Sequence, residues 1–147
     1  MSASTDIDFS RPTGNGVYVV GDDDLQALAK QAVRDELQVR RITLDGCRDK
    51  TELLRRIAQA LSLPASFGAN WDALADCLRD PRWAPGWGHA LLFDHADELR
   101  RTNERDFDIL LGILDDAATF ASEQDRPFFA LLSLPEQASR RQRANLA

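Results

Sequence analysis

Short β-rich apolar runs alternate with amphipathic helical stretches along this chain, and no other feature of the sequence constrains the fold as strongly. Each run is bounded by turn-forming residues, so strands are predicted at 17–20, 39–44, 90–93 and 128–132. Helices are predicted between them, two in the second interval, with room for a short extra helix at 95–101. The order βαβααβαβ is typical of a mainly parallel sheet with right-handed crossovers and helices packed on its faces.

The length of 147 residues is that of one domain with its own core. Polar, small and turn-forming residues at the start predict a flexible N-terminal arm over 1–16. Residues 17–133 are expected to form a single α/β domain, in which 17–40 add a βα unit before a core of 41–133. The remaining residues, 134–147, are rich in arginine and are predicted to be a disordered basic tail.

The net charge of the chain is −6 and its sequence pI is about 4.9, which argues against direct binding to nucleic acid and favours a basic partner. Two cysteines, Cys47 and Cys77, are too few for a disulfide framework and are not spaced with His89 or His95 as zinc ligands. The start of the chain has no secretory signal pattern, and no apolar run is long enough to span a bilayer. We therefore expect a cytoplasmic protein without membrane contact.

The third predicted helix carries the most informative pattern. It is expected to begin after Asn70, a favourable N-cap, and to end near Asp80. Apolar residues at helical spacing assign one side to the core: Trp71, Leu74 and Leu78, with Cys77 beside them. Carboxylates one turn apart follow a neighbouring exposed side: Asp72, Asp76 and Asp80. Like charges at this spacing each cost a helix roughly 0.2 to 0.5 kcal/mol, so the acidic row weakens its own helix.

Three interpretations of this acidic row remain open from the residues alone. It can be an ordinary solvated face, which is the usual role of charge runs on helices. It can bind a basic partner, or it can combine with Asp116 to hold a hard cation such as Mg²⁺. Catalysis is not expected, because the sequence has no Gly-rich phosphate loop and no serine or cysteine with an evident neighbouring base.

The stretch from Leu63 to Leu78 follows the pattern Leu-Pro-x-x-Phe-Gly-x-Asn-x-Asp-Ala-Leu-x-Asp-Cys-Leu. This pattern resembles the signature of the barstar family, small proteins that inhibit barnase-type ribonucleases. The order of elements is similar from residue 41 to residue 132. The resemblance implies a barstar-like three-stranded parallel sheet packed by helices, here extended by an N-terminal strand and helix.

The resemblance also implies a set of partner-binding residues. Asp76 matches the aspartate that enters the phosphate-binding site of the nuclease, and Asp72 matches one that meets an arginine loop. Gly68 and Asn70 match positions that contact the partner partly through their backbone. On the long helix, Asp116 matches an acidic position, with Asp115 as an exposed neighbour. Asp80 would extend the same acidic surface.

Two positions depart from the family pattern. Ser66 and Ala75 stand where the family presents aromatic side chains, so two aromatic contacts are missing. Trp83 and Trp87 are alternative aromatic contacts, although we expect them to cover the core. The sequence thus predicts a non-enzymatic inhibitor, an antitoxin or immunity protein, that is monomeric when free. It needs neither cofactor nor metal, and its partner is a basic extracellular-type or toxin ribonuclease. The alternative is a barstar-like binding module with a non-nuclease partner.

Overall fold

The computed structural model describes residues 7–64, 68, 70–80 and 87–135, together with the backbone of 141–143. Its elements are η1 Pro12–Gly14, β1 Gly16–Val20, α1 Asp22–Arg34, β2 Gln38–Thr43, α2 Lys50–Leu61, α3 Trp71–Leu78, β3 His89–Asp94, α4 Asp97–Thr102, α5 Glu104–Glu123, β4 Phe128–Ser133 and β5 Arg141–Arg143. The predicted alternation of strands and helices is confirmed, with small shifts in the end points.

Four parallel strands form the sheet in the order β2-β3-β4-β1, and β5 pairs antiparallel with β1. The parallel sheet has four strands and not the three of the family pattern, because the expected N-terminal strand, β1, joins β4 with Gly16 opposite Phe129 and Val20 opposite Ser133. The prediction of a disordered tail is also wrong for residues 141–143. A strand at the end of a sheet has unpaired N–H and C=O groups, and β5 pairs with β1 over residues 18–20.

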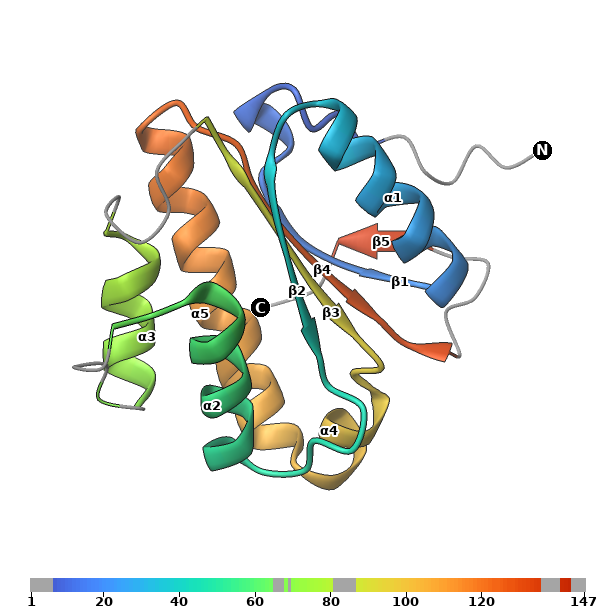
Figure 1. Ribbon diagram of the computed structural model, residues 1–147, viewed down its shortest axis with the longest axis vertical. Helices are drawn as coiled ribbons and strands as arrows, with labels where there is room; N and C mark the ends of the chain where they lie inside the picture. The colour runs from blue at the N-terminus through green and yellow to red at the C-terminus, as the bar shows by residue number, and fades with distance from the viewer. Residues whose placement is uncertain (1–6, 65–67, 69, 81–86, 136–140, 144–147) are drawn as a thin grey trace.

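Helices cover both faces of the sheet (Figure 1). Helix α1 lies on one face, while α2 and α5 lie on the other, and α3 packs against α5 as an outer helix. Strands β3 and β4 are buried along almost their whole length, as expected for central strands of a parallel sheet. The core therefore consists of two apolar clusters, one on each face.

The N-terminal segment is not a loose arm. Ile7 and Phe9 pack in the apolar cluster on the α1 face of the sheet, and Phe9 is fully buried. The ring of Phe9 meets that of Phe129 edge to face, with centroids 4.7 Å apart. The side chain of Gln31 on α1 donates to the carbonyl oxygen of Ile7 (2.6 Å). The predicted boundary at residue 16 is therefore wrong, because these two apolar residues belong to the core.

Asn15 fixes the end of this segment to the connection between α5 and β4. Its side chain is buried, and its Nδ2 donates to the carbonyl oxygen of Arg126 (2.8 Å). Its Oδ1 accepts from the backbone N–H of Phe128 (2.8 Å). A buried amide with both ends paired contributes to stability, whereas its local sequence, Gly14-Asn15-Gly16, indicated only a turn.

Candidate functional site

Helix α3 begins as the sequence predicts. Asn70 is its N-cap: the Oδ1 atom of Asn70 accepts from the backbone N–H of Ala73 (2.7 Å). The same side chain donates from Nδ2 to the carbonyl oxygen of Gly68 (3.3 Å). A Cβ at Gly68 would lie 3.0 Å from that nitrogen, which leaves little room for a side chain. Gly68 and Asn70, both exposed, therefore set the start of the acidic helix.

The buried side of α3 also follows the prediction. Leu74 and Leu78 are buried, and Trp71 packs partly buried against the same cluster. Cys77 is half-buried, and burial, followed by the charges of Asp80 and Asp76, raises the pKa of its thiol. This thiol is therefore not an activated nucleophile.

Asp72 and Asp76 lie on successive turns of α3, and both are exposed. Ala75 between them is half-buried, and its methyl group leaves no large side chain at that position. Because the other side of the helix is held by the core, the two carboxylates are presented on a rigid backbone. Asp72 lies in the first turn, where the helix dipole favours an anion.

Asp76 is paired within its own chain. Its Oδ1 accepts a hydrogen bond from Nη2 of Arg79 at 3.1 Å, and the two residues are three positions apart. The side chain of Asp76 is nevertheless 78% exposed and that of Arg79 is 46% exposed. An ion pair this exposed is weak, so Asp76 is not locked in place. The sequence analysis missed this pair, although the spacing Asp-x-x-Arg on a helix is its signal.

Asp80 differs from the other two aspartates. Helix α3 ends at Leu78, and Asp80 is half-buried beyond it, with its backbone N–H donating to the carbonyl oxygen of Cys77 (3.0 Å). The expected row of three exposed carboxylates on one helix is therefore wrong for Asp80, because the helix stops before the third turn is complete.

A cavity of about 110 Å³ lies at the end of α3, and Arg79, Asp80 and Phe120 are among the residues that line it. His89, which begins β3, is buried in its wall. Burial, and to a smaller extent Arg126 and Arg40, lowers the pKa of His89 to about 4. His89 is therefore neutral near pH 7, which is unsuitable for a cation that binds phosphate.

The other residues predicted to contact a partner or to cover the core differ in how exposed they are. On α5, Asp116 is exposed while Asp115 is half-buried, so the two are not equally exposed neighbours. Ser66 and Trp83 lie outside the described residues. Trp87 is 49% exposed, so the expectation that it covers the core is wrong.

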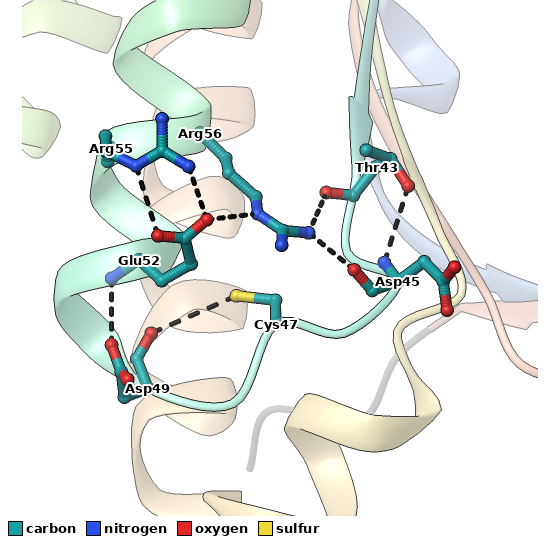
Figure 2. Close-up of polar contacts among 7 residues, drawn as sticks. All are labelled: Thr43, Asp45, Cys47, Asp49, Glu52, Arg55 and Arg56. Carbon is teal, nitrogen blue, oxygen red and sulfur yellow. Dashed lines mark hydrogen bonds and ion pairs between the residues drawn. The ribbon is translucent and has the colours of Figure 1, made fainter.

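A second polar cluster joins the start of α2 to the turn between β2 and α2, and Figure 2 shows it in detail. Glu52 accepts hydrogen bonds from Arg55 and Arg56, and these bonds lower its pKa to about 2. Arg56 also donates to the carbonyl oxygens of Thr43 (3.0 Å) and Asp45 (2.8 Å). Since two of the acceptors of Arg56 are backbone carbonyl groups of the turn, this cluster holds the β2–α2 turn in shape.

Asp49 is the N-cap of α2 in the same turn, where its Oδ1 accepts from the backbone N–H of Glu52 (2.8 Å). Asn103 caps α5 in the same way, through the N–H of Asp106 (3.3 Å). Among the described residues, no three His, Cys, Asp or Glu side chains are close enough together to hold a metal ion. No helix in the described parts of the chain is long and apolar enough to cross a membrane.

Comparison with known proteins gives a family and a similarity of fold. A family model described as Barstar (barnase inhibitor) matches residues 37–133. No curated protein matches the chain. A chain in the "Structure of Drosophila ORC bound to DNA" aligns with a TM-score of 0.52 and 18% identity. The alignment covers 80% of this chain and 32% of that one, so this chain spans about a third of its length. At this identity the similarity concerns the fold alone.

Proposed function

This chain belongs to the barstar family, and we propose that it inhibits a barnase-type ribonuclease by placing the exposed side of α3 in the enzyme's RNA-binding cleft. The observation that supports this most directly is the pair Asp72 and Asp76, exposed on successive turns of a helix whose other side is fixed in the core. The helix start at Gly68 and Asn70 would contact the partner beside them.

The chemistry of the target explains the choice of residues. A ribonuclease cleft binds a polyanion and is lined by Arg, Lys and His, which bind carboxylates as well as phosphates. A carboxylate on a rigid helix can occupy a phosphate pocket without being cleaved. Opposite charges on the two surfaces also accelerate their encounter. In this proposal Asp76 occupies the phosphate pocket, Asp72 meets a second cation, and Asp116 and Asp80 extend the acidic surface.

The proposal has consequences for the protein in the cell. It makes the chain a cytoplasmic immunity protein or antitoxin, monomeric when free, that contacts a basic nuclease and neither nucleic acid nor a membrane. It assigns the chain no catalysis, cofactor or metal. The partner contacts of Ser66 and Ala75 would differ from those of aromatic residues, so the target need not be barnase itself.

The decisive variant is Asp76→Ala. We expect it to weaken binding to the target nuclease by about 2 to 5 kcal/mol, because it leaves partner cations buried without a counter-charge. That range comes from barnase and barstar themselves, so it is carried over from a relative. Binding is measured by calorimetry and by inhibition of RNA cleavage at low salt. Asp23→Ala, which removes an exposed carboxylate on α1 at the opposite face, is the matched control and should bind like the parent.

A protein-binding module with a non-nuclease partner is the second candidate, and the small side chain at Ala75 is the observation that favours it. A pull-down with parent and Asp76→Ala proteins distinguishes the two. A basic ribonuclease retained only by the parent supports inhibition. A different protein retained only by the parent, with no inhibition of any barnase-type enzyme, supports the module.

A further inference from the structure

The carboxylate on which the proposed function depends already has a cationic neighbour. Arg79 Nη2 lies 3.1 Å from Asp76 Oδ1, and both side chains are substantially exposed. A nuclease arginine or lysine that binds Asp76 would have to displace this guanidinium or share the carboxylate with it.

We infer that Arg79 is a specificity-determining residue, which competes with the partner's cations for Asp76; this inference rests on the proposed function. In the free chain the negative charge of Asp76 is partly neutralised by Arg79, while Asp72, one turn earlier, is exposed. A partner therefore meets two unequal carboxylates. A partner cleft that contains only cations must break the Asp76–Arg79 pair when it binds. It also places Arg79 beside the positive charges of the cleft.

The competition is modest in energy and can be reversed. Exposed ion pairs three residues apart on a helix stabilise by a fraction of a kcal/mol, so a well-placed partner cation can displace Arg79. The strength of the effect depends on ionic strength, because both side chains are in contact with solvent. Arg79 thus selects between partners by small factors instead of blocking the surface.

Arg79 also lines the cavity at the end of α3, together with Asp80, Gln124 and Arg126. A partner that supplies a carboxylate near this cavity would hold Arg79 away from Asp76. The selected class of partner is therefore a basic cleft with an acidic group beside its cations.

Arg79→Gln tests the inference, with barnase as the probe. We expect association with barnase at low salt to become roughly two- to five-fold faster, and the gain to shrink as salt is added. Arg55→Gln is the matched control, since it removes an exposed arginine that pairs with an acid three residues earlier on a different helix. It should change association much less. Thermal melting of both variants shows whether the fold is retained.

The double variant Asp76→Ala/Arg79→Gln separates competition from simple repulsion. If Arg79 competes for Asp76, its removal accelerates association more when Asp76 is present than when it is absent. An equal or larger gain in the Asp76→Ala background means that Arg79 acts only through its charge, and this overturns the inference. An unchanged or slower rate for Arg79→Gln alone also overturns it.

The two proposals fail in different ways. If Asp76→Ala weakens binding but Arg79→Gln behaves like the parent, the inference about Arg79 is wrong and the proposed function stands. If barnase binds neither the parent nor Arg79→Gln, and the parent inhibits no other barnase-type ribonuclease, the proposed function fails and the inference fails with it.

Discussion

The β2–α2 turn and the exposed side of α3 each have an ion pair between an acid and an arginine, but the surroundings of the two pairs differ. Glu52 pairs with Arg55, and Asp76 pairs with Arg79, in each case with the acid three residues before the arginine. In the turn, Arg56 adds a third hydrogen bond to Glu52 and donates two more to backbone carbonyls, and its side chain is only 21% exposed. On α3 the acid is 78% exposed.

The difference separates stability from binding. The turn cluster is tied to the backbone, so its removal should disturb the fold. The carboxylate of Asp76 contributes little to its own helix, which is held by the Asn70 cap and by Leu74 and Leu78 on its buried side. A side chain that the fold does not need is free to bind a partner. Variants in the two regions should therefore affect different properties, stability in the turn and binding on α3.

His89 should show the largest effect on stability, because its imidazole is buried in the folded chain and burial disfavours its charged form. Its pKa is about 4 in the folded chain, against about 6.5 for an unfolded chain. Between these values the unfolded chain binds the proton and the folded one does not, so stability falls as the pH falls from 6.5 to 4. The loss should reach about 3 kcal/mol, measured by urea denaturation across this range.

Two variants control this experiment. His89→Gln should remove the loss between pH 6.5 and 4, while His95→Gln, which alters an exposed histidine, should retain it. The lowered pKa of Glu52 places its contribution in a separate range, where stability is lost as the pH falls from about 4.5 to about 2. An identical pH profile for His89→Gln and the parent would contradict the assignment.

Arg56→Ala should follow, with a loss of about 2 to 3 kcal/mol in the free energy of unfolding. The change removes a charged donor from Glu52 and leaves two carbonyl oxygens, those of Thr43 and Asp45, without this partner. Arg55→Ala is the control, since Arg55 is more exposed and bonds only to Glu52 in the described contacts. Equal losses for the two variants would show that the backbone bonds of Arg56 are unimportant.

The sequence predicts best those features that depend on neighbours along the chain. The N-caps at Asp49, Asn70 and Asn103 were predictable because a cap and the backbone N–H group that donates to it are within three residues of each other. The exposure of Asp72 and Asp76 followed from helical spacing. These are the features that define the candidate site.

Features that depend on distant partners were missed. Asn15 lies in a Gly-rich turn, and nothing near it in sequence shows that it bonds to Arg126 and Phe128 more than a hundred residues away. The burial of Phe9 likewise depends on Phe129. Asp80 was misplaced for a different reason: helical spacing continues through it, but helix ends are set by packing and capping.

Trp71→Phe should change the free energy of unfolding less than Arg56→Ala does, and in the opposite direction. The indole Nε1 of Trp71 is buried and has no hydrogen-bond acceptor among the described residues. Phenylalanine keeps most of the apolar contact with the core and removes the unsatisfied donor, so we expect stability to stay equal or rise by up to about 1 kcal/mol. Chemical denaturation measures this. A loss greater than that would show that the ring size, and not the N–H group, determines how α3 packs.

Asp76→Asn should have the smallest effect on stability and therefore tests the comparison most directly. It relieves the repulsion between Asp76 and Asp72, a gain of roughly 0.2 to 0.5 kcal/mol, and it loses the exposed pair with Arg79, a loss of similar size. The free energy of unfolding should thus change by less than about 0.5 kcal/mol, while binding to a cationic cleft weakens strongly. If unfolding instead became easier by more than about 1 kcal/mol, the Asp76 carboxylate would be part of the fold's own support. Its role would then resemble that of Glu52, and exposure alone would not separate binding residues from structural ones.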